Sequence, residues 1–499
     1  MKQLKNKFLI LFGCFGYVVA LTFFESLSPS FAIDEESLFF FPLILGNFDA
    51  IVGVNQLGDD ILDVNGRGVM TYETFVNAVS YQQDGLFTYN GYQYAAWYRD
   101  NLHAVIVRRK LPDGNWNALE FDYTLPADDS HNTISMSVSP NDGRFHIIFG
   151  THSPEIRYKQ SVAGLATQPE SHAWEAAKFG STLNQIPGTV LPIVNYTYPR
   201  FELVNEELLL TWRGGGAGNG KMDLLNYLGD GSWGYLGAYT SNEGEFSANG
   251  GSSQIRNAYL NGFTADDNDR IHISWVWREG DSSVTCPGGN IANHGVGYAY
   301  SEDNGRSWQN NTGNLIGVTG TSDLIHIDDD HILDPISVDN GLINQETQAI
   351  DNEGRFHTIF SYVPQYILDT WDTPCVTDLV NERTEFAQPH HLWRDSSGTW
   401  HKYEIPFIQG AIGRSKLVFD TFDNAYLVMP DLRILAASKV SGWTDWQLVF
   451  DAANISIDGE IIVDRQRVKT DNILSIMYQE ANDRVQPSAL RLIEFQLSS

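Results

Sequence analysis

Asn141-Asp-Gly-Arg-Phe-His146-Ile-Ile-Phe149 is a nine-residue unit that recurs without a gap at 267–275 and 352–360. Each copy is a polar turn, an arginine and then a strand that opens apolar, His, apolar. Weaker copies carry the turn and the strand alone, and they begin near Tyr89, Val204, Phe422 and Thr470. Similarity that recurs along a chain in this way is typical of propellers and repeat arrays. The sequence therefore contains seven copies of one β unit.

A second strand, a tight turn and a tryptophan follow most copies, at 113–116, 230–233, 301–308 and 396–400. The third of these fits the Asp-box pattern Ser-x-Asp-x-Gly-x-x-Trp, in which the Asp caps a hairpin turn and the Trp packs between sheets. Seven four-stranded units predict an all-β fold, a seven-bladed β-propeller in a single domain. The last strand, 490–497, has no partner hairpin, so we expect strands within 51–79 to close the ring.

The N-terminus has the composition of a secretory signal peptide. Lys2, Lys5 and Lys7 precede an apolar run over 8–24, and Ser30-Phe31-Ala32 offers small residues for cleavage. We therefore expect a signal peptide at 1–32, a propeller at 33–499 and secretion to the periplasm or the cell exterior. An uncleaved membrane anchor is the alternative, because the apolar run is long.

The chain is acidic, with a formal net charge of −30, and residues 1–32 carry three lysines and one glutamate, so the remainder is near −32. An acidic surface argues against nucleic-acid or anionic-membrane partners, which need basic surface. We expect a monomer that binds neither nucleic acid nor, after signal cleavage, membrane. A polyanionic substrate would need positive charge concentrated at its site.

Histidines of two kinds are present. His146, His272 and His357 occupy the same place in three repeats, so we expect them to pack alike as structural residues. His131 and His152 have no repeat counterpart, and they flank the strands on either side of the turn at 139–143. Adjacent antiparallel strands would bring both imidazoles to one face; two polar loop histidines are the alternative.

A phenol and a guanidinium stand at neighbouring strand ends. The strand 208–212 ends in Arg213 and a glycine-rich run that allows close approach of a ligand. Tyr198 precedes a proline, which favours an extended conformation. Tyr259 and Arg278 give the next repeat the same chemistry. A plain surface hairpin is the alternative for Arg213, and an ion pair with Glu279 or Asp281 is the alternative for Arg278.

Cys286, His294 and Cys375 lie in insertions of two repeats. In an oxidising compartment the two cysteines can form a disulfide. Alternatively, the cysteines and the histidine can be three ligands of a zinc ion, and the sequence does not identify the fourth ligand. The sequence leaves both interpretations open.

Several motifs of this chain, taken in their order, resemble those of the BNR-repeat proteins that include the seven-bladed ulvan lyases. The motifs are Tyr198-Pro-Arg-Phe, Trp212-Arg-Gly-Gly-Gly, Asn257-Ala-Tyr259, His272-Ile-Ser-Trp and the Asp box. The resemblance implies a secreted lyase that cleaves ulvan, a sulfated rhamnose–uronate polymer, by β-elimination. It implies that His131, His152, Tyr198 and Arg213 are catalytic, that Tyr259 and Arg278 bind substrate, and that Cys286, His294 and Cys375 hold a structural zinc. Asn293-His294-Gly295 has glycine where the related pattern often has aspartate.

The chemistry of β-elimination needs the same groups. Arginine neutralises the uronate carboxylate while a carbanion develops at C5, and histidine and tyrosine can exchange protons with C5 and O4. A sialidase-type hydrolase and a carbohydrate-binding propeller without activity are the alternatives.

Overall fold

The computed structural model describes residues 10–12, 18–20, 52–68, 70–71, 74–79, 81, 84–149, 152–289, 291–482 and 486–498. The chain divides into two units, Met1–Phe48 and Asp49–Ser499. In the first, only the paired strands β1 (Ile10–Phe12) and β2 (Val18–Ala20) are described. The rest of the predicted signal peptide, and residues 33–48, lie outside the described residues. No helix in the described ranges is long and apolar enough to cross a membrane.

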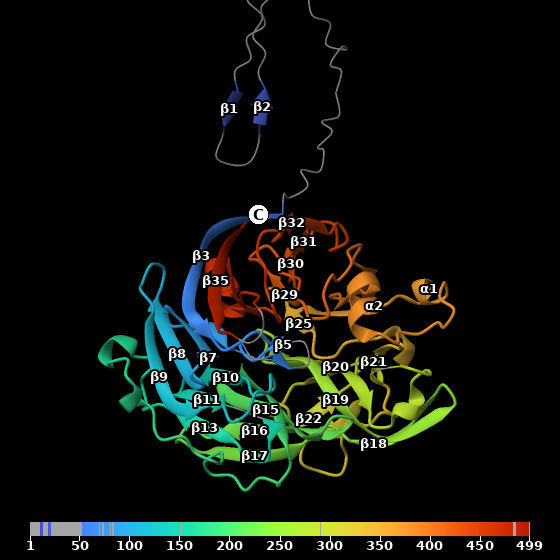
Figure 1. Ribbon diagram of the computed structural model, residues 1–499, viewed down its shortest axis with the longest axis horizontal. Coiled ribbons are helices and arrows are strands. Elements are labelled where there is room, and N and C mark those ends of the chain that lie inside the picture. The colour runs from blue at the N-terminus through green and yellow to red at the C-terminus, as the bar shows by residue number, and fades with distance from the viewer. Residues whose placement is uncertain are drawn as a thin grey trace, which may run out of the picture. The chain divides into compact units, whose positions relative to one another are not determined.

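The second unit is an all-β propeller, in which successive sheets follow one another around a centre (Figure 1). Six of its sheets have four or more strands. Three of these are β6 (Leu86–Tyr89), β7 (Tyr92–Tyr98), β8 (His103–Lys110), β9 (Asn117–Thr124); β25 (Thr347–Ile350), β26 (Phe356–Tyr362), β27 (Gln388–Arg394), β28 (Trp400–Glu404); and β29 (Lys416–Phe419), β30 (Ala425–Val428), β31 (Ile434–Ala437), β32 (Gln447–Phe450).

Two sheets are larger than a simple blade. One has five strands, β12 (His152–Ser153), β14 (Tyr196–Val204), β15 (Glu207–Gly216), β16 (Asn219–Tyr227) and β17 (Trp233–Ala238). The other contains β18 (Glu243–Ala248), β19 (Gly251–Ala265), β20 (Ile271–Glu279), β21 (Asn293–Ser301), β22 (Ser307–Gln309), β23 (Leu315–Val318) and β24 (Ile332–Asp334).

Strands from both ends of the unit close the ring, as predicted. The strand β3 (Gly53–Gly66) pairs with β35 (Ser488–Ser498), which continues to β34 (Ile473–Gln479) and β33 (Ile462–Val463). In Figure 1 the blue β3 lies beside the red β35. After β3 the chain forms the short pair β4 (Met70–Thr71) and β5 (Thr74–Phe75), and β5 lies near the centre of the ring.

The prediction of seven four-stranded blades is wrong for the second repeat, which leaves six full blades in the described chain. Its sheet has three strands, β10 (Ile134–Val138), β11 (Phe145–Phe149) and β13 (Arg157–Gln160). The segment after β13 makes only isolated bridges, at Tyr158–Leu183 and Ser161–Phe179, because turns and 3₁₀ helices interrupt it. The short β12, meanwhile, joins the next sheet through β14.

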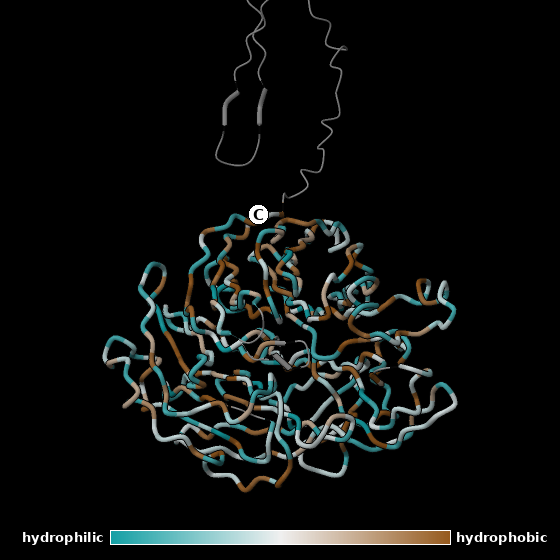
Figure 2. The backbone as a smooth tube through the Cα atoms, viewed as in Figure 1, coloured by the Kyte–Doolittle hydropathy of each residue, from teal (hydrophilic) through white to brown (hydrophobic). Residues whose placement is uncertain are grey.

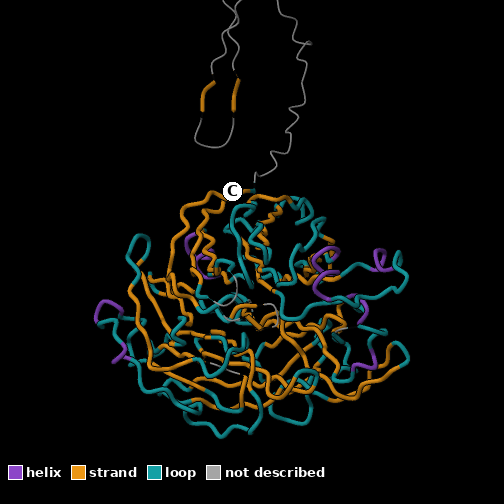
Figure 3. The backbone as a smooth tube through the Cα atoms, in the orientation of Figure 1, coloured by secondary structure: helices purple, strands orange, loops and turns teal. Residues whose placement is uncertain are grey.

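Helices are short and lie in the connections between strands (Figure 3). They are α1 (Gln365–Leu368), α2 (Leu379–Phe386) and α3 (Arg465–Asp471). The first two belong to the connection between β26 and β27, and a loop over 280–292 joins β20 to β21. Cys286 and Cys375 lie in these two insertions, as predicted, whereas His294 lies on β21.

The core consists of apolar side chains packed between neighbouring sheets, so hydrophobic and hydrophilic residues are interleaved throughout the propeller (Figure 2). Trp308 of the Asp box is fully buried and its ring stacks on Tyr239 at 5.0 Å. Asp303 accepts hydrogen bonds from the Ser307 amide at 2.8 Å and the Ser307 hydroxyl at 2.6 Å. The predicted cap and packing role of this motif are thus confirmed.

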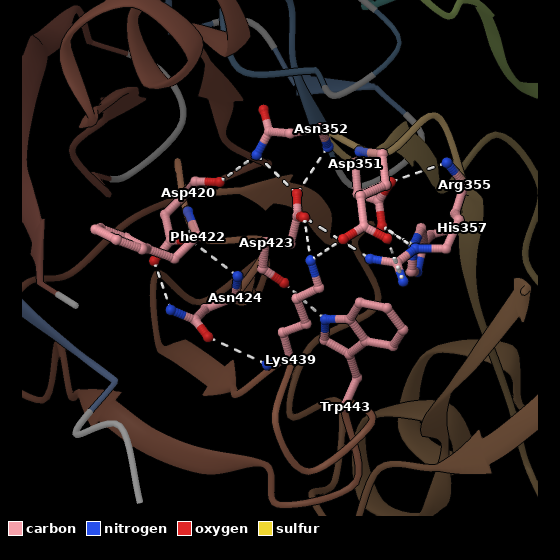
Figure 4. Close-up of polar contacts among 11 residues, drawn as sticks. Asp351, Asn352, Arg355, His357, Asp420, Phe422, Asp423, Asn424, Lys439 and Trp443 are labelled. Carbon is pink, nitrogen blue, oxygen red and sulfur yellow. Dashed lines mark hydrogen bonds and ion pairs between the residues drawn. The ribbon is translucent and has the colours of Figure 1, made fainter. Parts of the chain in front are cut away.

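Clusters of hydrogen bonds and ion pairs join the turns of neighbouring blades, and Figure 4 shows one such cluster. The Asn352 amide nitrogen donates to Asp423 at 2.7 Å, and the Lys439 ammonium donates to the same carboxylate at 2.9 Å. The Trp443 indole donates to the Asp423 carbonyl at 2.8 Å, and the Arg355 guanidinium lies 4.7 Å over the Trp443 ring. The repeat arginine Arg355 therefore has a structural role at this turn.

The repeated histidines are structural, as predicted. The Nδ1 atoms of His146 and His272 contact tyrosine hydroxyls at 2.6 and 2.8 Å, and Nδ1 of His357 contacts His391 at 2.9 Å. In each case the partner lies on a neighbouring strand of the same sheet, and all three imidazoles are buried.

Candidate active site

A cavity of 490 Å³ is lined by all six residues that were predicted from the sequence to act in catalysis and substrate binding. They are His131, His152, Tyr198, Arg213, Tyr259 and Arg278. His131 precedes β10 and His152 lies on β12. Tyr198 and Arg213 lie on β14 and β15, and Tyr259 and Arg278 lie on β19 and β20. Chain segments of three successive repeats therefore meet at one cavity.

The two histidines lie face to face. Their ring centroids are 4.4 Å apart and the rings are inclined by 25°. His152 reaches this position because β12 pairs with β14, which places it opposite Thr197 and next to Tyr198. The prediction that the ends of β10 and β11 bring these imidazoles together is confirmed.

One carboxylate holds both rings. Asp129 Oδ1 contacts Nδ1 of His131, and Oδ2 contacts Nδ1 of His152, each at 2.6 Å. Burial alone would raise the pKa of Asp129, but these hydrogen bonds outweigh it and lower that pKa. Burial lowers the pKa of His131, against the opposing effect of Asp129, so the His131 imidazole is neutral at neutral pH.

Tyr198 does not have the extended conformation that its proline neighbour predicts. Its φ is +62°, in the left-handed region that tyrosine rarely adopts. The ladder between β14 and β15 shifts register between Thr197 and Arg200, so Tyr198 and Pro199 form a β-bulge. The bulge holds the phenol at the cavity, and a strained residue of this kind is typical of functional sites.

Burial raises the pKa of the Tyr198 phenol well above its usual value, although the nearby arginines Arg213, Arg414 and Arg278 oppose the shift. The phenol is therefore protonated at neutral pH and can donate a proton.

Arg213 is almost fully buried behind the phenol. Its guanidinium carbon lies 4.9 Å from the ring of Tyr198, and it donates to the Tyr259 hydroxyl at 2.9 Å and to the Thr197 hydroxyl at 3.0 Å. Within the described residues its Nε–H has no hydrogen-bond partner. A buried guanidinium with an unsatisfied donor is suited to an anionic ligand group.

The glycine-rich hairpin between β15 and β16 packs against the end of β20. Gly218 has φ +67°, and a Cβ there would lie 2.6 Å from the Cα of Gly280, so no other residue fits. Its amide donates to the Asn257 side chain at 2.6 Å. Gly215, Gly216 and Ala217 consequently line the cavity with little side-chain bulk.

Arg278 also lines the cavity, and the alternative of a structural ion pair is not formed. Glu279 instead pairs with Arg256 and His294, and Asp281 accepts from the Ser283 amide. Within the described part of the chain Arg278 has no ion-pair partner, so it remains available to a ligand.

Sequence reasoning missed several lining residues. Tyr81 lies 5.7 Å from His131 and 4.9 Å from Tyr198, between ring centroids. Arg414 lies 5.5 Å from the Tyr81 ring and pairs with Glu460 at 2.8 Å. These residues belong to segments far apart in the sequence and to no repeat motif, so no local signal marks them. Asp129 was visible beside His131, but nothing in the sequence shows that it reaches His152.

The rest of the lining is mixed. It consists of the apolar side chains Ile291, Ile343, Leu379, Val380 and Ile412, the polar side chains Asn195 and Asn344, and Gly413. The cavity thus combines titratable and other polar groups with apolar side chains.

The predicted zinc ligands do not fit a metal site. Cys286 and Cys375 form a disulfide, with Cα atoms 6.6 Å apart, so neither offers a thiolate. His294 lies elsewhere: its Nε2 contacts Glu279 at 2.9 Å and its ring stacks on Phe246 at 3.8 Å. The disulfide, one of the two interpretations left open by the sequence, is the one observed.

Comparison with known proteins identifies relatives. The family model described as a BNR repeat-containing family member matches residues 92–408. The chain is 26% identical over 298 residues to ulvan lyase, long isoform, from Alteromonas sp. (strain LOR), a match that covers 52% of this chain and 28% of that protein. The ulvan lyase of Pseudoalteromonas sp. (strain PLSV) matches to the same extent. The chain thus spans less than a third of the length of these relatives.

Solved structures share the fold. The polysaccharide lyase Uly1 superposes with a TM-score of 0.64 at 17% identity, over 90% of this chain and 99% of that one. A PL25 ulvan lyase bound to -[GlcA(1-4)Rha3S]- superposes with a TM-score of 0.56 at 12% identity, over 89% and 96% of the two chains.

Proposed function

Because this chain belongs to the BNR repeat-containing family, and because two imidazoles, a phenol and a guanidinium line one cavity of its propeller, we propose that it is a polysaccharide lyase acting by β-elimination. The convergence of these four groups is the observation that carries the proposal. The relatives named as ulvan lyases support the same class of reaction.

The proposed substrate is a sulfated uronate polymer such as ulvan, and the product carries an unsaturated uronate at its non-reducing end. The polymer and the protein are both negatively charged overall, so attraction of the polymer to the cavity depends on the local cations Arg213 and Arg278. We place the enzyme outside the cell, in keeping with the N-terminal sequence, and we propose that it is a monomer.

Arg213 is assigned to the uronate carboxylate. Loss of the C5 proton leaves charge that delocalises into this group, and a buried bidentate donor stabilises it as it develops. Among the described residues, the Nε–H of Arg213 has no hydrogen-bond partner.

Proton transfer is assigned to the other three residues. A neutral histidine, His131 or His152, takes the C5 proton, and the C–H electron pair forms the C4–C5 double bond. The C4–O4 bond breaks, and protonated Tyr198 supplies the proton to O4. The lowered pKa of His131 and the raised pKa of Tyr198 suit a base and an acid respectively.

The test is incubation of the mature chain with a panel of uronate polysaccharides, followed by ultraviolet absorbance of the unsaturated uronate. Arg213→Asn should lose turnover while keeping its far-ultraviolet circular dichroism. Arg270→Asn is the matched control, because Arg270 is a turn arginine paired with Glu302 outside the cavity. Near-normal turnover in Arg213→Asn would remove Arg213 from this role.

A sialidase-type hydrolase is the second candidate, because Arg213, Arg278 and Arg414 line the same cavity as Tyr198. Such an enzyme needs a carboxylate to activate its tyrosine, whereas Glu460 bonds to Arg414. Reducing ends that appear without ultraviolet absorbance would favour the hydrolase, and polymer binding without either product would favour a binding propeller.

A further inference from the structure

We propose that a second cavity, of 510 Å³, is a carbohydrate-binding site that takes an uncharged sugar residue. Its walls come from β24, from α1, from β27 and from the ends of β26 and β28. The side chains that carry the argument are Asp334, Tyr362, Tyr366, His390 and Glu404. None of these five lines the candidate active site.

Two hydrogen-bond acceptors lie side by side in this cavity. His390 on β27 is paired directly with Glu404 on β28, so both side chains lie on the same face of the sheet. Nδ1 of His390 donates to the Gln388 carbonyl at 3.0 Å, which places the ring proton on Nδ1. Burial lowers the pKa of His390 to about 3, so at neutral pH its Nε2 carries a lone pair and no proton. Nε2 lies 3.4 Å from Glu404 Oε2, which is an acceptor as well.

These two acceptors lack a donor within the described chain. His390 is 3% exposed, and no described residue donates a hydrogen bond to its Nε2. The Tyr366 hydroxyl donates to Oε1 of Glu404 at 2.9 Å, which leaves Oε2 facing the imidazole. A buried acceptor without a donor is costly, so the pair favours a ligand that brings donors of its own. Neighbouring hydroxyl groups of one sugar ring would donate to both atoms.

The rest of the cavity also fits a sugar. Tyr366 is 56% exposed, so its ring can pack against the C–H face of a sugar. The Tyr362 hydroxyl accepts from Lys402 at 2.8 Å and keeps its own proton, which it can donate to a sugar oxygen. Cavities that combine an aromatic surface with a few placed polar groups are typical of small-ligand sites.

The charges of the lining favour a sugar without carboxylate or sulfate. Asp334 and Glu404 line this cavity, and its described lining contains no arginine or lysine. Negative groups of a ligand would therefore be repelled. The candidate active site differs, because Arg213 and Arg278 line it.

A metal ion is the other ligand that a histidine and a carboxylate could share. A metal site needs further ligands, and among the described residues no third His, Cys or carboxylate atom lies within 4.8 Å of both His390 Nε2 and Glu404 Oε2. The two acceptors are thus better suited to hydroxyl donors than to a metal.

The second cavity lies near the candidate active site. Asn340 lines the second cavity and Ile343 lines the first, so their Cα atoms are at most about 11 Å apart. The connection between β26 and β27 contributes Tyr366 to the second cavity and Leu379 to the first. We infer that the sugar bound here is an uncharged residue of the polymer that is cleaved in the first cavity. This last step rests on the proposed function.

Glu404→Gln is the discriminating variant. Its amide oxygen can still accept from Tyr366, whereas its NH₂ supplies from within the protein the donor that His390 Nε2 lacks. Tyr366→Ala removes the exposed ring at the surface and serves as the second variant. Glu385→Gln is the matched control, because Glu385 is an exposed carboxylate on α2 that lines neither cavity.

The probe is a hexasaccharide of ulvan that has been desulfated and carboxyl-reduced. It has no charge and no uronate, so it can be bound without being cleaved. In isothermal titration calorimetry the wild type, the control and Arg213→Asn should bind it alike. Glu404→Gln and Tyr366→Ala should each bind it at least about 10-fold more weakly. If Glu404→Gln does not fold, Tyr366→Ala decides.

No binding of the probe to the wild type would overturn the proposal. Binding that is lost in Arg213→Asn and kept in Glu404→Gln would also overturn it, because the probe would then occupy the first cavity. In lyase assays on the intact polymer, Glu404→Gln should raise KM and leave kcat unchanged; an unchanged KM would refute the link to the cleaved polymer. If no polysaccharide is cleaved, the proposed function fails, whereas the titration still tests the second cavity.

Discussion

Removal of the Cys286–Cys375 disulfide should destabilise the propeller by a calculable amount. The bond joins residues 89 apart, so the loop-closure entropy that it removes from the unfolded chain corresponds to about 4.5 kcal/mol. The propeller unit, 49–499, has about 450 residues, and its unfolding entropy is on the order of 0.95 kcal/mol per kelvin. The ratio predicts that Cys286→Ser/Cys375→Ser melts about 5 °C below the wild type.

The assay is calorimetry of the double variant and of the wild type with and without reductant and chelator. Thiol alkylation before and after reduction should show that both sulfurs are oxidised in the untreated protein. Reductant should lower the Tm of the wild type alone, and chelator should change neither protein. A Tm that falls with chelator and not with reductant would show metal-bound thiolates and refute the reasoning. A decrease below about 1 °C would show that the loop is already constrained in the unfolded state.

Three further results are expected. Tyr198→Phe should lower kcat by about 10²- to 10⁴-fold in ultraviolet rate assays, because the ring packing remains while the acid is lost; a smaller change would assign the acid elsewhere. Arg256→Met should cost about 3–5 kcal/mol in denaturant unfolding, because it leaves the fully buried Glu279 without its bidentate partner; Arg256→Met/Glu279→Gln should recover most of this. Burial lowers the pKa of His146 to about 3, so between pH 6.5 and 3 the unfolded chain binds a proton that the folded chain does not. Stability is therefore lost as pH falls, and His146→Gln should reduce the slope by about 1.4 kcal/mol per pH unit; an unchanged slope would contradict this.

The sequence predicted the propeller, because the repeated turn and strand are local patterns that survive in several copies. It also predicted ring closure, because an unpaired final strand needs a partner. It did not predict the three-stranded second sheet, since the irregular segment after β13 occupies the place of a strand without its alternation.

At the site, the nominated side chains could be placed because strand ends of neighbouring repeats lie on one face. The left-handed conformation of Tyr198 was missed, because the register shift that imposes it depends on pairing with β15. Tyr81 and Arg414 were missed because their approach to the cavity depends on the ring as a whole.

The position of β35 between β3 and β34 has a consequence for biogenesis. Until Ser488–Ser498 has been synthesised, the two flanking strands β3 and β34 present unpaired edges. The ring consequently cannot close before this strand has been added. A prematurely terminated product would expose the same edges and be marked for aggregation or proteolysis.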